Sequence, residues 1–337
     1  MNVVSVPERV RVSYGSAVLL ELAKGVSDVA PTTIYLLTYN EGRCTANCAF
    51  CPQSRKSTAK LDRLSRVVWP DFKTEEAVER LVDSWKAGRA ERACIQSLNY
   101  DEMFSDVRGL VVTLRRETRI PISVSIKPLS VDQLEELKAL GVDRVSIPLD
   151  CANSDVFRSV KGLGVSGPYS WRAHWKGLKE ALLVFGRGRV STHLIVGLGE
   201  TDRDLAKVFQ QLTDLGIFPG LFAFTPVQGT RLEGSSRVPI ARYRRVQLLH
   251  FLITRGMTRY MNLVFTDKGE LVDLGLPRQV LAEAIRSGLP FRTSGCPGCN
   301  RPFYTESPRG PFYNFPCPPR EKEIDQIEDL LLGLNHD

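Results

Sequence analysis

Short runs of β-branched and apolar residues alternate along the chain with longer amphipathic stretches. The runs that predict strands cover residues 32–39, 92–98, 120–126, 143–149, 189–197, 220–227 and 258–265. Apolar side chains recur with a helical period between several of these runs, over residues 74–88, 130–141, 200–216 and 241–256. Alternation at this spacing is typical of parallel βαβ units. We therefore expect an α/β fold, a TIM-like barrel that is partial or full, with its active site at the carboxyl ends of the strands.

Two segments interrupt this alternation. Residues 53–73 are basic and lack a clear period, so we expect a loop there. Residues 288–320 are rich in proline and equally aperiodic, which predicts a segment held by a metal centre rather than by an apolar core. Residues 321–334 have the pattern of a closing amphipathic helix. The predicted organisation is an N-terminal helical extension over 1–30, a barrel over 31–287, and a C-terminal cluster-binding extension over 288–337.

Composition is that of an ordinary globular protein, with 43% hydrophobic and 25% charged residues. No apolar run approaches the ~20 residues that span a bilayer, and the N-terminus does not read as a signal peptide, so we expect a cytoplasmic protein. The net charge of +7 favours an acidic partner, although simple solubility would explain it equally well.

Six of the eight cysteines fall into two tight groups. The first group, C-x3-C-x2-C directly after the first predicted strand, comprises Cys44, Cys48 and Cys51. The second, in the proline-rich segment, comprises Cys296, Cys299 and Cys317. Such spacing indicates metal or redox chemistry rather than structural disulfides. We expect the two remaining cysteines, Cys94 and Cys151, to be small buried residues.

Three thiolates are too few for a structural zinc site but can hold three corners of a [4Fe-4S] cluster and leave one iron open. We expect such a cluster on each group, with zinc or a disulfide as the alternative at the first. At the second, the alternative is a zinc knuckle completed by a ligand such as His336. Ser294 or a water could complete a second cluster instead.

The first cysteine group, with Phe50 before its third cysteine, resembles the signature of the radical S-adenosylmethionine (SAM) superfamily. The stretches "CAFCPQS", "KPLSVDQLEELKALGVDRVSIPLD" and "LIVGLGET" resemble its biotin synthase branch, and the likeness covers most of residues 30–265. It implies that SAM binds the open iron of the first cluster and is cleaved to a 5′-deoxyadenosyl radical. The residues that it implies contact the cofactor are Gln96, Asn99, Asp150, Ile195, Gly197 and Glu200.

Strand parity adds further candidates. If residue 191 points into the barrel, His193 does too, and Ser123, Ser125 and Lys127 also face inward. His193 and Lys127 are therefore candidate ligands, while an inward lysine requires an anionic partner or water. A tight strand-to-helix turn is the alternative explanation for Gly197 and Gly199.

The chain departs from biotin synthase at its second cluster, which that family holds with three cysteines and an arginine inside the barrel. Cys94 stands at the first of these positions, but Ser123 and Ser191 stand at the other two, and hydroxyls are poor iron ligands. The segment "CPGCNRPFYTESPRGPFYNFP" instead resembles a subunit of the two-component lipoyl synthases. The cysteine set and the Arg-Ser-Ser motif of single-chain lipoyl synthases are absent.

That resemblance implies sulfur insertion from the second cluster into an unactivated C–H bond of a protein-bound octanoyl chain. The implied partners are an octanoylated lipoyl carrier protein, a second related radical SAM subunit and an electron donor such as ferredoxin. We expect no membrane and no nucleic-acid partner. The alternatives are a biotin-synthase-like or methylthiotransferase-like radical SAM enzyme with another substrate, or a non-catalytic zinc or iron–sulfur protein.

Overall fold

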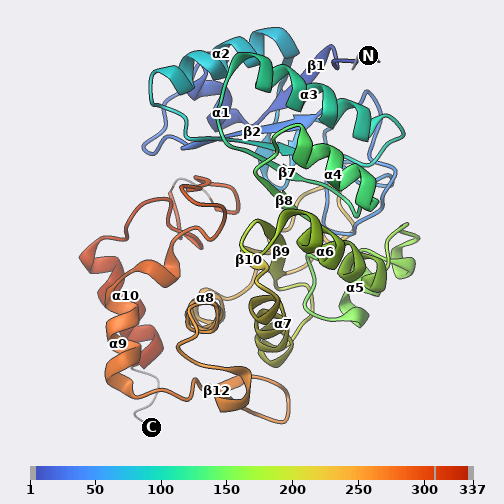
Figure 1. Ribbon diagram of the computed structural model, residues 1–337. Coiled ribbons are helices and arrows are strands. Elements are labelled where there is room, and N and C mark those ends of the chain that lie inside the picture. Colours follow the sequence, from blue (N-terminus) through green and yellow to red (C-terminus); the bar gives the residue numbers. More distant parts are fainter. Residues whose placement is uncertain (1–4, 307–308, 333–337) are drawn as a thin grey trace.

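The parallel sheet that the sequence predicts is the centre of the computed structural model, which describes residues 5–306 and 309–332 (Figure 1). Its eight strands lie in the order β10-β9-β8-β7-β6-β2-β1-β5. The parallel strands are β2 (Thr33–Thr38), β6 (Arg92–Gln96), β7 (Ile122–Ser125), β8 (Arg144–Ser146), β9 (Val190–Val196) and β10 (Phe218–Ala223). Because β10 and β5 are the two edges, the sheet is an open, partial barrel, as the α/β pattern predicted.

Helices that follow the strands cover the convex face of this sheet (Figure 1). They are α2 (Thr74–Lys86), α3 (Met103–Glu117), α4 (Val131–Ala139), α6 (Trp171–Phe185), α7 (Asp202–Leu215) and α8 (Ile240–Thr254). The short helices α5 (Ser154–Val160) and η1 (Leu163–Val165) pack instead beside the loop after β2, where Ala49 N donates to Val160 O at 2.7 Å. The central strands are apolar on the side facing the helices, and Ile95, Ile122 and Val124 are fully buried there. The main core therefore lies between sheet and helices, and the inner side is left for polar residues.

One predicted strand is wrong. Residues 258–265 form a short 3₁₀ helix, η2 (Tyr260–Asn262), and a two-residue strand β11 (Val264–Phe265). β11 pairs with β12 (Leu271–Asp273) in a separate hairpin outside the main sheet. Met261 and Val264 are exposed, so the apolar run reflects surface residues rather than a buried strand.

The N-terminal region differs from the predicted helical extension. β1 (Arg9–Val12) joins the sheet antiparallel to both β2 and β5 (Asp71–Lys73), and α1 (Tyr14–Leu19) is only six residues long. Two further short strands, β3 (Arg63–Leu64) and β4 (Val67–Val68), form a hairpin inside the predicted loop. β1 alternates Arg and Val, and Val10 and Val12 are fully buried. The run is so short that its period of two is easily missed.

The C-terminal region packs as a second apolar cluster against α8. It contains α9 (Arg278–Arg286), η3 (Leu289–Phe291) and α10 (Glu321–Leu332), and its fully buried Ile285 and Phe291 pack with Leu252 of α8. Between η3 and α10 the described residues form no helix or ladder apart from one bridge, Arg292 to Phe315. The segment is as irregular as its sequence predicts, but the expectation that no apolar core holds it is wrong, because Phe291 and Phe315 pack in this apolar cluster. No helix within the described residues is long and apolar enough to cross a membrane.

Candidate active site

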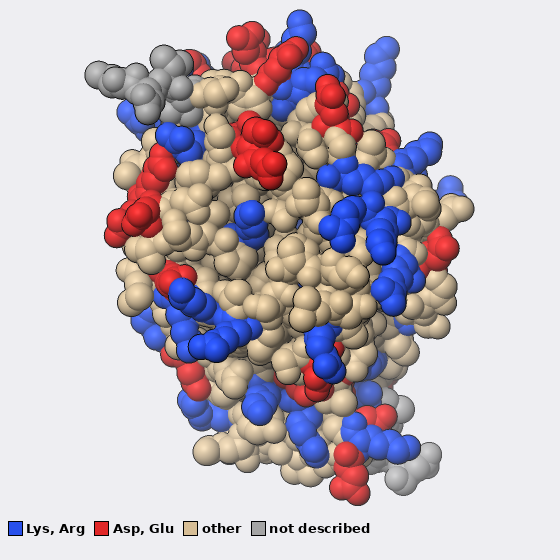
Figure 2. Space-filling model, turned by 90° about the vertical axis from the view of Figure 1, so that its right-hand side faces the viewer, with Lys and Arg blue, Asp and Glu red and all other residues tan. Residues whose placement is uncertain are grey.

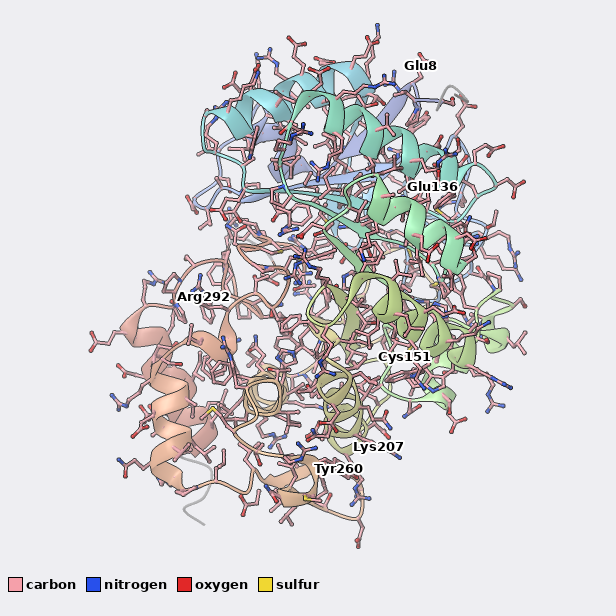
Figure 3. All side chains as sticks on the ribbon, in the orientation of Figure 1. Glu8, Glu136, Cys151, Lys207, Tyr260 and Arg292 are labelled. Atoms are coloured by element: carbon pink, nitrogen blue, oxygen red, sulfur yellow. The ribbon has the colours of Figure 1, made fainter. Side chains whose placement is uncertain are left out.

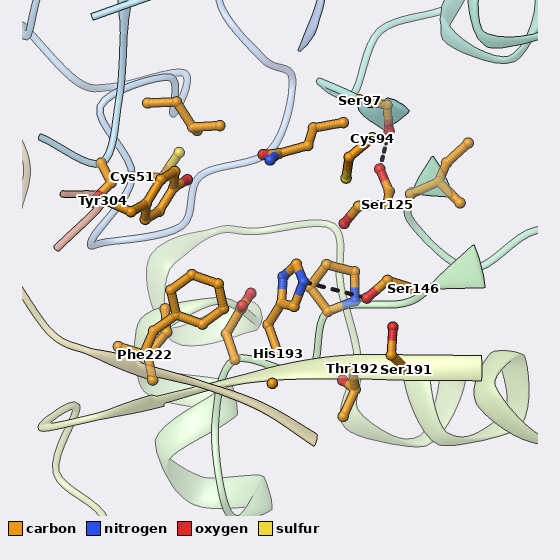
Figure 4. A pocket seen from close by; sticks show the side chains of 18 of the residues that line it. Cys51, Cys94, Ser97, Ser125, Ser146, Ser191, Thr192, His193, Phe222 and Tyr304 are labelled. Carbon is orange, nitrogen blue, oxygen red and sulfur yellow. Dashed lines mark hydrogen bonds between the residues drawn. The ribbon is translucent and has the colours of Figure 1, made fainter. Parts of the chain in front are cut away.

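The inner side of the partial barrel encloses a cavity of about 270 Å³. Inward-facing residues of all six parallel strands line it, among them Tyr35, Cys94, Ser123, Ser146, Ser191 and Gly220. Ser125, Lys127 and His193 line it too, which confirms the inward parity predicted for β7 and β9. Figure 4 shows Cys51 and Tyr304 on one side of this space and Cys94 and Ser125 on the other.

The first thiol group lies in the loop after β2. Cys44, Cys48 and Cys51 all line the cavity, and none of them is in a disulfide. The loop is fixed by its own backbone, because Cys44 N donates to Gln53 O at 3.0 Å and Cys51 N to Cys48 O at 3.1 Å. The backbone N–H of Asn99 donates to Cys44 Sγ at 3.2 Å. Hydrogen bonds of this kind support the sulfur ligands of a cluster.

These features fit an iron–sulfur cluster on three thiolates. Within residues 5–306 and 309–332, no three or more His, Cys, Asp or Glu side chains gather closely enough to hold a single metal ion. A four-iron cluster places each thiolate on a different iron and so spaces its ligands more widely. Phe50, which precedes Cys51 in the sequence, also lines the cavity.

Burial dominates the protonation of these thiols. It raises the pKa of Cys48 to about 12, and the nearby Lys161 ammonium works against that shift. It also raises the pKa of Cys51, to which the neighbouring Cys48 and Cys44 thiols contribute. The thiols are therefore protonated at neutral pH in the metal-free chain, and binding of a metal centre must release protons.

A buried ion pair lies beside this loop. Lys161 Nζ is 2.7 Å from Asp150 Oδ2, and both side chains are buried. Although burial works to lower the pKa of Lys161, the Asp150 carboxylate more than offsets it, and the pKa is raised. Lys161 Nζ also lies 5.3 Å from the centre of the Tyr169 ring. Sequence reasoning proposed Asp150 but missed Lys161, because a lysine at the end of a helix usually faces solvent.

The cofactor residues proposed on β6, β8 and β9 converge on the cavity. Gln96, Asn99, Asp150, His193 and Ile195 all line it. His193 Nε2 lies 3.4 Å from Ser146 Oγ, and its ring meets the Phe222 ring edge-on at 5.1 Å. Burial lowers the pKa of His193 to about 4, so the imidazole is neutral at physiological pH.

Gly197 and Glu200 are not among the residues that line the cavity. The Glu200 carboxylate accepts from the backbone N–H of Gly197 at 2.8 Å and of Leu198 at 2.9 Å. Gly197 has φ of 105°, and a Cβ there would lie 3.2 Å from Phe224 Cβ. This geometry fits the alternative of a tight strand-to-helix turn at Gly197, and the Glu200 carboxylate stabilises the same turn.

The second thiol group is divided by the structure. Cys296 and Cys299 line the same cavity as the first group, whereas Cys317 is exposed and lies outside it. Ser294 lines the cavity, and its Oγ accepts from Leu221 N at 2.7 Å. His336, the alternative zinc ligand, lies outside the described residues.

The two isolated cysteines also differ from each other. Cys151 is fully buried in an apolar cluster with Phe157, as expected. In Figure 3 it lies in the interior, well to the right of Arg292, which leads into the C-terminal cysteine loop. Cys94 instead lines the cavity and is only partly buried.

Two further cavity residues come from the C-terminal segment. The Arg301 guanidinium lies 3.8 Å from the centre of the Phe222 ring and donates to Ser294 O at 2.8 Å. Tyr304 meets the same ring at 5.6 Å. Sequence reasoning missed both, because only the folded chain brings residues 301–304 against β10. They add positive charge and aromatic surface beside the thiols.

Comparisons with known proteins agree with this arrangement. The family profile described as "Radical SAM superfamily" matches residues 42–212, about half of the chain. The biotin synthase of Mycobacterium leprae (strain TN) is 27% identical over 184 residues, which cover 54% of this chain and 49% of that protein. The chain thus spans about half the length of that relative. The biotin synthase of Persephonella marina is 27% identical over 219 residues, 63% of this chain and 60% of that protein.

Solved structures show the same fold at low identity. The hydrogenase maturase HydG from Carboxydothermus hydrogenoformans aligns with a TM-score of 0.51 and 19% identity, covering 66% of this chain and 51% of that one. Methylornithine synthase PylB aligns with a TM-score of 0.50 and 14% identity, covering 66% and 63%. With the partial barrel, the cysteine loop after its first parallel strand and the matching profile, the chain belongs to the radical SAM superfamily.

Proposed function

We propose that this protein inserts sulfur into an unactivated C–H bond of a protein-bound octanoyl chain, as a subunit of a two-component lipoyl synthase. The observation that carries the proposal is one cavity lined by thiols from two separate parts of the chain, the loop after β2 and the C-terminal segment. A substrate in such a cavity can meet a radical source and a sulfur source without leaving the protein. Membership of the superfamily supplies the first of these.

Cys44, Cys48 and Cys51 would hold the radical-generating [4Fe-4S] cluster, and thiols from the C-terminal segment the second. When bound, the first cluster with SAM supplies a 5′-deoxyadenosyl radical, and the second supplies the sulfur atom. The chain itself positions the reactants. Gln96, Asn99 and the Asp150–Lys161 pair provide polar contacts for SAM near the first thiols, and Phe222 and Ile195 provide apolar surface for an alkyl chain.

The distance between the two thiol groups suits a substrate that lies between them. Cys94, on β6, faces the C-terminal thiols. Asn99, five residues further along the chain, donates its backbone N–H to Cys44 Sγ in the first group. Extended chain rises at most about 3.4 Å per residue, so this stretch spans no more than roughly 17 Å. Holding reactants within that length in a fixed orientation is the protein's main contribution to the rate.

Surface charge supports an acidic carrier as the substrate protein. The chain has a net charge of +7, and Figure 2 shows Lys and Arg side chains on both sides of a broad uncharged area on one face. Complementary charge accelerates docking of an acidic octanoylated lipoyl carrier protein. The proposal also includes a second, related radical SAM subunit for the other sulfur atom and an electron donor such as ferredoxin.

The test is an anaerobic assay of the reconstituted protein with SAM, a reductant and an octanoyl-lysine carrier peptide, with and without a second subunit. We expect 5′-deoxyadenosine and a peptide that gains sulfur, detected by mass spectrometry. A Cys44→Ala control should yield neither product. SAM cleavage without sulfur in the peptide, or sulfur found in tRNA instead, would contradict the proposal.

A biotin-synthase-like activity is the second candidate, favoured by 27% identity to biotin synthases. The same assay with the biotin synthase substrate in place of the peptide separates the two. Ser123 and Ser191 line the cavity at the positions where the resemblance requires cysteines, which disfavours this candidate.

A further inference from the structure

We propose that Cys94, Cys296 and Cys299 form the thiolate site of a second iron–sulfur cluster, and that Cys317 is not one of its ligands. The inference deepens the proposed two-cluster function by naming which residues build the second site. It pairs a cysteine from the middle of the barrel with two from the C-terminal segment, which sequence spacing does not suggest.

The register of the sheet places Cys94 between two inward-facing neighbours. β2, β6 and β7 are parallel neighbours, and Cys94 is paired with Tyr35 on one side and with Ser123 on the other. Paired positions in a parallel sheet point their side chains to the same face, and neighbouring strands are about 4.8 Å apart. Tyr35, Cys94 and Ser123 therefore form a row across the inner face, with the Cys94 thiol at its centre.

The C-terminal thiols contact both ends of this row. Tyr35 Oη lies 3.1 Å from Cys299 Sγ, and Ser123 Oγ lies 3.4 Å from Cys296 Sγ. Because Cys94 stands between the two residues that make these contacts, the three thiols surround a common space. The turn that joins Cys296 and Cys299 is closed by a 3.0 Å hydrogen bond from Cys299 N to Cys296 O.

The hydroxyl groups of Tyr35 and Ser123 can donate the hydrogen bonds that thiolates accept. Arg92 Nη1 donates to Ser123 Oγ at 3.0 Å, which leaves the Ser123 proton free to be donated to Cys296 Sγ. Tyr35 can donate to Cys299 Sγ in the same way. Residues that hydrogen-bond to metal ligands orient them and stabilise their charge. This gives Ser123 a role as a donor to a ligand, where the biotin synthase pattern would place the ligand itself.

The C-terminal loop is anchored beside this row on both sides of the cavity. Thr32, just before β2, donates its backbone N–H to Asn300 Oδ1 at 3.0 Å and its hydroxyl to Gly298 O. On β10, Leu221 N donates to Ser294 Oγ at 2.7 Å. The thiols of Cys296 and Cys299 are thus held in place by polar contacts to two strands, as a preorganised ligand site requires.

Cys317 belongs to a different part of the molecule. Its neighbour Phe315 is packed in the apolar cluster with Phe291, and Phe315 N donates to Phe291 O at 2.9 Å. Cys317 itself is exposed and does not line the cavity.

The principal test isolates the second site. In a chain with Cys44, Cys48 and Cys51 all changed to Ala, we expect anaerobic reconstitution to give about four irons and four sulfides per chain. Adding Cys94→Ala should reduce both several-fold and abolish the electron paramagnetic resonance signal of the reduced cluster. Adding Cys317→Ala should change neither. Circular dichroism checks that each variant is folded, and Cys151→Ala is a matched control for loss of a buried thiol.

Loss of iron with Cys317→Ala but not with Cys94→Ala would overturn the ligand assignment while leaving the sulfur-insertion function intact. Zinc without sulfide in the triple variant would overturn the second cluster and, with it, the sulfur donor. The two failures are therefore distinguishable.

An independent test uses the unmodified chain. Alkylation of the reconstituted protein with iodoacetamide, followed by peptide mass spectrometry, should modify Cys317 and leave Cys94, Cys296 and Cys299 protected. Chelator-treated protein should lose that protection. Equal reaction of Cys94 before and after cluster removal would overturn the assignment.

Discussion

At the scale of single residues, the buried Asp150–Lys161 pair is the feature with the largest predicted effect on stability. The two side chains lie 2.7 Å apart and are nearly inaccessible to solvent. Removing one partner of such a pair leaves an uncompensated buried charge, which is far less favourable than losing both. The pair also lies beside the loop that carries the first thiol group. An unpaired Asp150 or Lys161 charge would therefore change the electrostatic potential at these thiols.

Lys161→Met should therefore lower the free energy of unfolding by about 3–5 kcal/mol. The double variant Asp150→Asn, Lys161→Met should recover most of this loss, because no charge is left buried. Urea unfolding followed by circular dichroism measures both. Arg158→Ala, which removes an exposed ion pair with Asp155, is the control and should change stability by less than about 1 kcal/mol. An equal loss of stability in Lys161→Met and in Arg158→Ala would contradict the prediction.

His250 should make stability depend on pH. Burial lowers its pKa from 6.5 to about 4, and its Nε2 donates to Pro219 O at 2.7 Å. Below pH 6.5 the unfolded chain binds a proton that the folded chain does not, so this contribution to stability is lost as pH falls from 6.5 through 4.

His250→Gln should retain the donor and reduce the decline in stability across that range by up to about 3 kcal/mol, at about 1.4 kcal/mol per pH unit. Urea midpoints at pH 7, 5.5 and 4.5 check it. Parallel curves for the variant and the parent chain would refute the role of His250. His174 and His193, which are also shifted downward by burial, provide the remaining slope in both proteins.

Which site residues can be predicted from sequence depends on how local their geometry is. Cys44, Cys48 and Cys51 lie in one short loop, so their spacing alone brings them together. Strand parity correctly predicted that Ser123 and His193 face the cavity, because the alternation of side chains along a strand is also local. Cys94 lines the same cavity as Cys296 and Cys299 only because segments some 200 positions apart pack together, and no periodicity encodes that packing.

At the scale of elements, long periodic helices were more predictable than short strands. At the start of α4, Ser130 and Gln133 form a reciprocal capping box that fixes where the helix begins. The apolar runs of the six parallel strands were long enough to reveal them, whereas β1 and β5 became strands only by pairing with neighbours. The exposed run near β11 misled because apolar composition does not by itself bury a segment.

Ser130→Ala should lower the free energy of unfolding by about 1 kcal/mol, because Gln133 N then lacks its acceptor. Ser130→Gly should lower it by only a few tenths of that, since glycine is tolerated at this position. Urea unfolding resolves the difference. A larger loss with glycine than with alanine would show that backbone flexibility, rather than the cap, controls this end of α4.

At the scale of the whole molecule, the net charge of +7 should govern the encounter with the carrier. Raising ionic strength from about 0.05 to 0.5 M shortens the Debye length roughly threefold. The KM for an acidic octanoylated carrier domain should then rise several-fold with kcat unchanged. A short, neutral octanoyl peptide is the control and should show little salt dependence. Equal salt dependence for both substrates would contradict docking through charge.

The contacts of the C-terminal loop with β2 and β10 also bear on the order in which the protein matures. The ribosome completes the loop after β2 early, whereas residues 296–299 emerge only near the end of translation. Folding of this kind depends on joining distant parts of the chain, which is slow. The thiols of the loop after β2 would therefore be available for cluster assembly on the nascent chain. Cys296 and Cys299 would reach their binding positions only after the chain leaves the ribosome.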